Sequence, residues 1–352
     1  MSIDSLSNRK KFIIVGRKGV GKTTVQMKLA GKLKDDGYVT HIFRFMYDLR
    51  SDDYAEISKT QTSISYTSIG NEKNLFLHYD FRDVWERVFL RRIGETLLGA
   101  GIENDFTKFV APQGSKFKNI FEGLTKNLRI KISGELGPLV ADFGIETSDS
   151  EIELKNFNKI ARELLKKSCQ ETKFYFFIDE LVFSKLDARD DEITLRAAMV
   201  RDVLRTAWEL NQFSVQNGLD FHFICALRPE IRNLINEYDS ESGKFLDGKD
   251  VELSWLSKDS EQGTLILEVL RSKIEYSRIP PPKYDDFMAR NIHFGHKSLD
   301  IGEFLLTNTW GRPRDIVRLL VSIAKNLQML KSLVKMKSRQ VSMNTPELQR
   351  RN

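Results

Sequence analysis

The sequence predicts an α/β fold, because short apolar runs alternate with segments of helical periodicity. Residues 11–15, 174–178 and 221–227 are apolar runs of strand length, which is typical of strands buried on both faces of a parallel sheet. After these runs come segments in which apolar residues recur three or four positions apart, as on one face of a helix. A chain of 352 residues with 41% hydrophobic residues and 8 prolines has ample material for such a core.

The elements can be placed in order along the chain. The first strand, 11–15, passes at Gly16 into a helix in which Val25, Leu29 and Leu33 share one face, and Gly37 lies just past its end. The elements expected after it are a strand at 39–46, a helix at 81–98, a β-hairpin at 129–146, a helix at 152–167, a strand at 174–178, a helix at 192–213 and strands at 221–227 and 250–256.

From about residue 259 onward the pattern is helical only, which predicts a separate small subdomain. The expected organisation is a core over 1–256 interrupted by an insertion at about 50–160, a helical lid over 257–335, and a basic flexible tail over 336–352. Residues 325–352 hold seven basic residues and one acidic residue, a local charge of +6 that equals the net charge of the chain.

Several protein classes are excluded or disfavoured by composition. No apolar run approaches the roughly 18 residues that a membrane-spanning helix needs. The N-terminal residues MSIDSLSNRKK have no apolar signal region followed by a small-residue cleavage site. Cys169 and Cys225 lie far apart in sequence, and Cys225 sits in an apolar run. We therefore expect a reduced cytoplasmic protein without membrane contact.

Residues 16–23, Gly-Arg-Lys-Gly-Val-Gly-Lys-Thr, fit the pattern G-x-x-x-x-G-K-[ST] between a buried strand and a helix. Glycines let the backbone turn tightly, so that successive N–H groups and the start of the helix point at one anion. Lys22 is expected to contact the β- and γ-phosphates and Thr23 to ligate Mg²⁺. The predicted nucleotide-binding residues are Gly16, Arg17, Lys18, Gly19, Val20, Gly21, Lys22, Thr23 and Thr24.

Two acidic residues, Asp179 and Glu180, follow the apolar run 174–178. A carboxylate at the carboxyl end of a buried parallel strand lies where ligands gather in open α/β sheets. Asp179 is expected to hold Mg²⁺, and Glu180 to orient and deprotonate the attacking water. No N-K-x-D guanine signature is present, since the stretch beginning at Asn158 lacks the Asp, and the adjacent Glu180 also argues against a GTPase. These residues do not separate ATP from other purine triphosphates.

These two motifs resemble the additional-strand, catalytic-glutamate class of P-loop ATPases, in particular its AAA+ and STAND groups. The resemblance covers about 16–48, 174–256 and 257–330. It implies a three-layer P-loop core whose parallel strands run in the order 5-1-4-3-2. The general architecture is also similar to that of bacterial P-loop ATPases in phage-defence and other conflict systems, which suggests antiviral defence as a setting.

The resemblance also assigns two arginines. Arg228, at the end of strand 221–227, resembles the arginine with which STAND ATPases sense the γ-phosphate. Arg314, in Trp310-Gly311-Arg312-Pro313-Arg314-Asp315, resembles the second sensor of the AAA+ lid, as in origin-recognition ATPases. Two departures stand out. Cys225-Ala226-Leu227 offers no polar first sensor, and Lys22 lies 157 positions before Asp179.

The function expected from these residues is Mg²⁺-dependent ATP hydrolysis that drives a conformational or assembly switch in a partner protein or another subunit. Two alternatives stay open. One is a nucleic-acid-dependent ATPase that uses the basic C-terminal end, and the other is a nucleotide-gated protein-binding module with little turnover. In a self-associated form, Arg196, Arg201 and Arg205 on the helix 192–213 are candidates for an arginine finger to a neighbouring subunit. Such a row is more often a solvated helix face.

Overall fold

The computed structural model describes the residues that build the predicted sheet and part of the C-terminal segment. The described residues are 4–45, 47–55, 57, 79–111, 154–181, 190–255, 267–272, 291–294, 297–309, 312–323 and 325–326. By their internal contacts they form two units. The first comprises Met1–Gly16 and Lys22–Glu252, and the second comprises Arg17–Gly21 and Leu253–Asn352. The hairpin expected at 129–146 and the tail at 336–352 lie outside the described residues.

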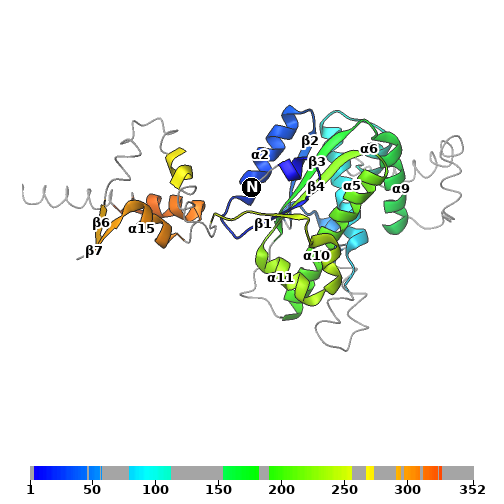
Figure 1. Cartoon of the computed structure of the whole chain (residues 1–352). Coiled ribbons are helices and arrows are strands. Elements are labelled where there is room, and N and C mark those ends of the chain that lie inside the picture. Colours follow the sequence, from blue (N-terminus) through cyan, green and yellow to red (C-terminus); the bar gives the residue numbers. More distant parts are fainter. Residues whose placement is uncertain are drawn as a thin grey trace, which may run out of the picture. The chain divides into compact units, whose positions relative to one another are not determined.

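The first unit is built on a five-stranded, all-parallel sheet (Figure 1). Its strands are β1 (Ile13–Val15), β2 (Val39–Arg44), β3 (Lys173–Leu181), β4 (Asp220–Leu227) and β5 (Asp250–Glu252). The order across the sheet is β2-β3-β4-β1-β5. Read from the β5 edge, this order is 5-1-4-3-2. The apolar runs form the central strands, and the expected α/β class with a parallel sheet is confirmed.

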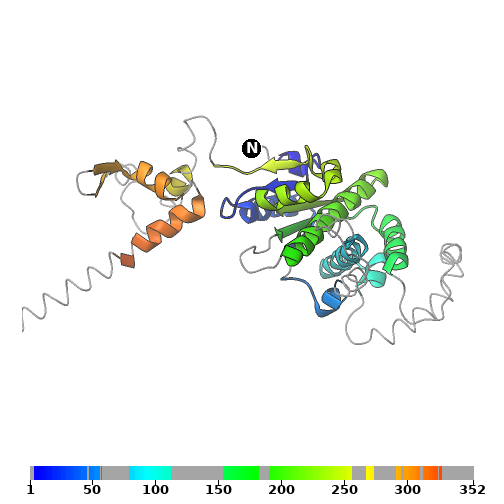
Figure 2. The ribbon, with the colours of Figure 1, turned by 90° about the horizontal axis from the view of Figure 1, so that it is seen from below.

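Helices cover both faces of this sheet, which is compatible with a three-layer α/β fold (Figure 2). On one face α2 (Lys22–Asp35) meets β3, where its Thr23 contacts Asp179. On the other face lie α5 (Arg82–Gly99) and α10 (Asp190–Gln216). Phe89 of α5 packs its ring against Phe176 of β3 and Phe223 of β4. Side chains along a strand alternate between the two faces of the sheet, so Phe176 and Asp179, three positions apart, point to opposite faces. Helix α5, which contacts Phe176, and helix α2, which contacts Asp179, therefore lie on opposite sides of the sheet.

Part of the segment expected to be an insertion belongs to the core. The sequence assigns 50–160 to an insertion, yet α5, which lies within that range, packs on the sheet through its buried aromatic residues. Helices α6 (Asp105–Val110) and α9 (Leu154–Ser168) pack against α5 and extend this layer. The shorter helices of the unit are α1 (Asp4–Ser7), α11 (Pro229–Tyr238) and α12 (Gly243–Leu246), with a 3₁₀ turn at Ser240–Ser242.

The second unit is not purely helical, which corrects the expectation for the chain after residue 259. Strands β6 (Asn291–Phe294) and β7 (Lys297–Asp300) form an antiparallel ribbon, followed by α15 (Ile301–Asn308). In the sequence only two residues, beginning with Gly295, separate these strands, which is typical of a tight hairpin. The strands are too short for their alternation to stand out beside helical periodicity. A small apolar core holds Leu270, Ile301, Leu305 and Ile316.

Two further findings bear on the setting of the protein. No helix among the described parts of the chain has the length and apolarity needed to cross a bilayer. Cys169 and Cys225 are both free thiols buried in the first unit. Burial raises the pKa of the Cys225 thiol, so this side chain behaves as a small apolar core residue.

Candidate nucleotide site

The loop after β1 has the backbone that an anion-binding turn requires. Gly19 has a φ of 89° and Gly21 a φ of 101°, both in the left-handed region where residues with a Cβ are strained. The amide of Gly16 donates to the Leu227 carbonyl at 3.1 Å, which fixes the start of the loop to β4. Helix α2 begins at Lys22, so the loop passes directly into a helix N-terminus, where backbone N–H groups are available to an anion.

Lys22 folds back over the loop. Its Nζ donates to the Gly16 carbonyl at 2.5 Å, which brings the ammonium group across the turn from the first helical residue to the first loop residue. The positive charge of Lys22 thus lies next to the first residue of the loop. The role expected of Lys22 from the motif, contact with the phosphates, stays a prediction.

Thr23 and Asp179, the two predicted metal ligands, are in direct contact. The Thr23 hydroxyl donates to Asp179 Oδ2 at 2.6 Å, although the two residues are 156 positions apart. Asp179 is 4% exposed, and its Oδ1 accepts the Glu180 N–H at 2.8 Å. Hydroxyl and carboxylate oxygens are ligands that Mg²⁺ prefers, and Mg²⁺ commonly takes one or two protein oxygens together with phosphates and water. Within the described residues there is no group of three or more His, Cys, Asp or Glu side chains suited to a metal ion.

Glu180 lies in a β-bulge at the carboxyl end of β3. Ile178 pairs with Cys225 and Leu181 with Leu227, so Asp179 and Glu180 together oppose a single residue of β4. Glu180 has a φ of 59°, one of two positive φ values among the described non-glycine residues. The bulge turns Asp179 inward and leaves the Glu180 side chain exposed. Backbone strain at a residue next to a predicted metal ligand is typical of functional sites.

A cavity of about 640 Å³ opens beside this acidic pair. It is bordered by Thr23 and Met27 of α2, by β2 and by α5, and Asp179 and Glu180 line it. Arg44, in register with Asp179 on the neighbouring strand, donates to Asp48 Oδ1 at 2.8 Å. These hydrogen bonds raise the pKa of Arg44. Burial alone would raise the pKa of Asp48, but the contacts from Arg44 outweigh it and lower that pKa. Both side chains are therefore charged at neutral pH.

Arg228 lies at the same edge of the sheet. It follows Leu227, whose register partners are Val15 of β1 and Leu181 of β3, and it is half-buried at the N-cap of α11. Its backbone thus stands between the loop strand and the acidic strand. The preceding Cys225, Ala226 and Leu227 are buried and offer no polar side chain, as the sequence indicates.

Arg314 belongs to the second unit and lies beside the loop residues of that unit. A Cβ built on Gly19 would lie 3.6 Å from the Cβ of Arg314. The Trp255 indole N–H donates to the Val20 carbonyl at 2.8 Å within the same unit. Arg314 is exposed near the start of the helical residues 313–323. Trp310 and Gly311, which also belong to the motif, lie outside the described residues.

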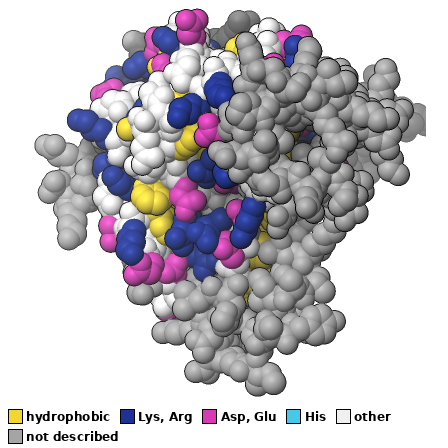
Figure 3. Space-filling model, turned by 90° about the vertical axis from the view of Figure 1, so that its right-hand side faces the viewer, with side chains coloured by type: hydrophobic (Ala, Val, Ile, Leu, Met, Phe, Trp, Pro, Cys, Tyr) yellow, Lys and Arg dark blue, Asp and Glu magenta, His cyan; other side chains and the backbone are white. Residues whose placement is uncertain are grey.

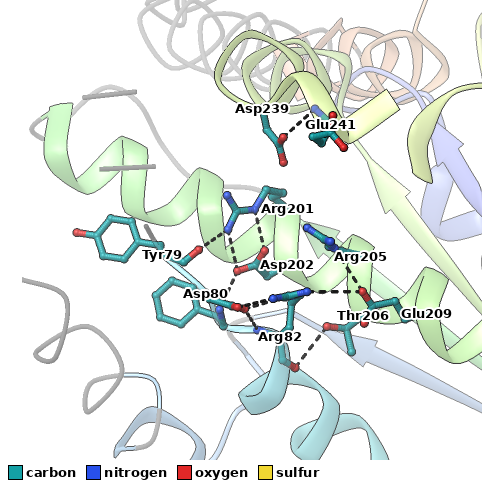
Figure 4. Close-up of polar contacts among 11 residues, drawn as sticks. Tyr79, Asp80, Arg82, Arg201, Asp202, Arg205, Thr206, Glu209, Asp239 and Glu241 are labelled. Atoms are coloured by element: carbon teal, nitrogen blue, oxygen red, sulfur yellow. Dashed lines mark hydrogen bonds and ion pairs between the residues drawn. The ribbon is translucent and has the colours of Figure 1, made fainter. Parts of the chain in front are cut away.

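One sequence hypothesis is wrong for Arg201. It was a candidate for reaching a neighbouring subunit, but its guanidinium is buried and bonds to Asp202 and to the Tyr79 carbonyl (Figure 4). Asp202 also accepts the Phe81 N–H at 2.8 Å, so this pair holds the chain entering α5 against α10. Of the other two arginines, Arg205 is partly exposed and forms a 3.3 Å pair with Glu209 (Figure 4).

Two residues near the acidic pair were missed by sequence reasoning. Gln26 is buried on the face of α2 that meets β3, whereas Val25, which the periodicity selected, is only half-buried. A signal was available, since residues 26, 29, 30 and 33 form a better helical stripe in which Gln26 is the one polar residue. Arg44 stands at the end of a predicted strand and gave no signal, because cross-strand register is not readable from sequence.

Comparisons with known proteins give no relative to which these features can be referred. No protein-family model, curated protein or solved structure matches the chain. The functional interpretation therefore depends on the geometry of the chain's own residues.

Proposed function

We propose that the chain binds ATP with Mg²⁺ at residues 16–24 and hydrolyses it. The observation that carries this proposal is the 2.6 Å contact between Thr23 and Asp179, which joins the phosphate-loop motif to the acidic strand end. The motif supplies anion-binding backbone and a lysine, and the strand end supplies carboxylates. Neither feature alone specifies a nucleotide, but their meeting at one sheet edge is what a Mg²⁺-triphosphate site requires.

Each residue has a defined task in this proposal. The loop amides and Lys22 bind the phosphates, and Thr23 and Asp179 hold the metal ion. When bound, Mg²⁺ neutralises charge on the phosphate oxygens. Glu180 orients a water molecule and accepts its proton as the water oxygen attacks the γ-phosphorus and ADP leaves. The exposed Glu180 side chain, which lines the cavity and follows a left-handed backbone, supports this role.

Arg228 and Arg314 are proposed to report the γ-phosphate. Arg228 stands at the carboxyl end of the strand between β3 and β1, and Arg314 stands beside Gly19 in the second unit. An arginine that contacts a phosphate at the start of a helix ties the position of that helix to the nucleotide state. We propose that this change is passed to a partner protein or another subunit, with phage defence as the candidate setting.

Backbone strain like that at Glu180 occurs at active sites, ligand clamps and switch regions alike. What favours hydrolysis over a nucleotide-gated module with little turnover is the Glu180 carboxylate at the cavity, where it can take a proton from water. The nucleic-acid-dependent alternative relies on the basic end of the chain, and that end lies largely outside the described residues. On the face shown in Figure 3, described Lys and Arg side chains are interspersed with Asp and Glu.

The proposal is tested by measuring phosphate release and nucleotide binding in the same preparations. Wild-type protein should release phosphate from MgATP, and Glu180→Gln should bind MgATP but release phosphate at least about 100-fold more slowly. Lys22→Ala should lose nucleotide binding. Equal rates in wild type and Glu180→Gln would remove Glu180 from the mechanism, and wild-type affinity in Lys22→Ala would refute the phosphate-loop assignment. A rate that rises with added DNA at low salt would favour the nucleic-acid-dependent alternative.

A further inference from the structure

A buried amide on α2 contacts the strand just before the acidic pair. Gln26 has an exposed fraction of 0% and occupies a place that the helical stripe would otherwise give to an apolar residue. Its Nε2 donates to the Ile178 carbonyl at 3.1 Å. The acceptor is a carbonyl, so the NH₂ end of the amide must face it.

The position of this contact along β3 is what makes it informative. Ile178 is the last residue of β3 in regular register with β4 before the bulge that holds Asp179 and Glu180. Thr23, one helical turn before Gln26, contacts the Asp179 carboxylate. Residues at i and i+3 lie on the same face of a helix. Helix α2 therefore holds two consecutive residues of β3, one through its carbonyl and one through its carboxylate, directly before Glu180.

Stability does not explain an amide at this position. The Oε1 of Gln26 is buried and has no hydrogen-bond partner among the described residues. A buried acceptor left in this state costs free energy, whereas leucine or methionine would fill a similar volume with no polar atom to satisfy. An apolar residue would thus serve the packing of α2 at least as well. What it would not do is bond to the Ile178 carbonyl.

We infer that Gln26 is a positioning residue for Glu180, an inference that rests on the proposed ATP hydrolysis. A bulge inserts one extra residue into a strand, and a shift of that extra residue by one position exchanges the faces to which its neighbours point. By holding the Ile178 carbonyl, Gln26 fixes where the bulge begins. Asp179 then points to Thr23, and Glu180 points to the cavity in which the attacking water would lie.

The test compares Gln26→Leu with Asn211→Leu. Asn211 is a matched control, because it is also a buried amide on a helix that bonds to a strand, with contacts to the backbone of Phe223 in β4. Gln26→Leu removes the unpartnered Oε1 but also the donor to the Ile178 carbonyl, and these two effects on stability oppose each other. We therefore expect a melting temperature close to that of wild type, a KM and a MgATP dissociation constant within about twofold of wild type, and a kcat lowered at least about tenfold. Asn211→Leu should melt at a lower temperature and keep the wild-type kcat per folded molecule.

A second readout does not depend on activity. In nucleotide-free protein, the Glu180 amide bonded to Asp179 should exchange its hydrogen at least about tenfold faster in Gln26→Leu than in wild type, and not in Asn211→Leu. Gln26→Met provides the same comparison with a more adaptable side chain. A wild-type kcat together with wild-type exchange at Glu180 would overturn the inference. If wild-type protein itself does not hydrolyse ATP, the proposed function fails, and the exchange rates alone decide whether Gln26 fixes the bulge.

Discussion

Replacing Glu180 by glycine should make the protein more stable while it abolishes hydrolysis. The left-handed conformation at Glu180 costs a residue with a Cβ roughly 1–2 kcal/mol. Glycine removes this strain but adds unfolded-state entropy worth about 0.5–1 kcal/mol. Because the Glu180 side chain is exposed, its removal loses little packing. At the middle of both ranges, the net expectation is a gain of about 0.75 kcal/mol in the free energy of unfolding.

Glu180→Gln is the control for this experiment. Glutamine removes the charge beside Asp179 but keeps the Cβ, so the backbone strain stays. Urea unfolding at pH 7.5 should give Glu180→Gly a higher free energy of unfolding than Glu180→Gln, and phosphate release should be lost in both. If the glycine variant is no more stable than the glutamine variant, the strain at Glu180 is not a real property of the fold, and the argument that the carboxylate is held for function fails.

Three further perturbations have defined outcomes. Burial lowers the pKa of His222 to about 4, below the 6.5 of an unfolded chain, so the folded state resists protonation and stability falls as the pH drops from 6.5 toward 4. Urea unfolding at pH 7.5 and 4.5 should show this loss of stability, about 2–3 kcal/mol, in wild type and not in His222→Gln. Equal pH dependence of stability in the two proteins would contradict the assigned burial of His222. Asp202→Ala leaves the Arg201 charge buried without its partner and should lower the free energy of unfolding by about 3–5 kcal/mol. Arg205→Ala on the same helix should lower it by under about 1 kcal/mol. Similar losses in the two variants would refute the burial assigned to the pair of Arg201 and Asp202. Gly21→Ala should lose about 1–2 kcal/mol and weaken MgATP binding, while Gly31→Ala within α2, where a Cβ meets nothing within 4 Å, should stabilise by about 1 kcal/mol.

The parts of the fold that the sequence predicts best are those with strong local signals. The strand expected at 11–15, the glycine-rich turn and the following helix are all present. In this segment the apolar run, the positions of the glycines and the lysine, and the helical spacing of the apolar residues all indicate the same strand, turn and helix. The run 174–178 and its two carboxylates are predicted for the same reason. The bulge at Asp179 and Glu180 is not predicted, since it arises from pairing with β4, which is 40 or more residues away in the chain.

The errors have physical causes as well. The role of α5 as a layer on the sheet depends on its aromatic contacts with β3 and β4, and these are long-range contacts that periodicity does not report. The ribbon of β6 and β7 is short, so helical periodicity on either side concealed it. Gln26 was missed because the helix face was assigned from the apolar residues Val25, Leu29 and Leu33 alone. Arg201 was expected on an accessible helix face, and its burial depends on its contacts with Asp202 and Tyr79, the second of which is distant in sequence.

The most direct test of the central claim is whether Thr23 and Asp179 together hold a metal ion on a bound nucleotide. ATP binding should be titrated calorimetrically with and without Mg²⁺ in wild type, Thr23→Val and Asp179→Asn. We predict that Mg²⁺ strengthens ATP binding to wild type at least about tenfold, and that each substitution removes most of this gain while metal-free binding changes little. A Mg²⁺ effect of wild-type size in both variants would show that the contact between these two side chains is not a metal site.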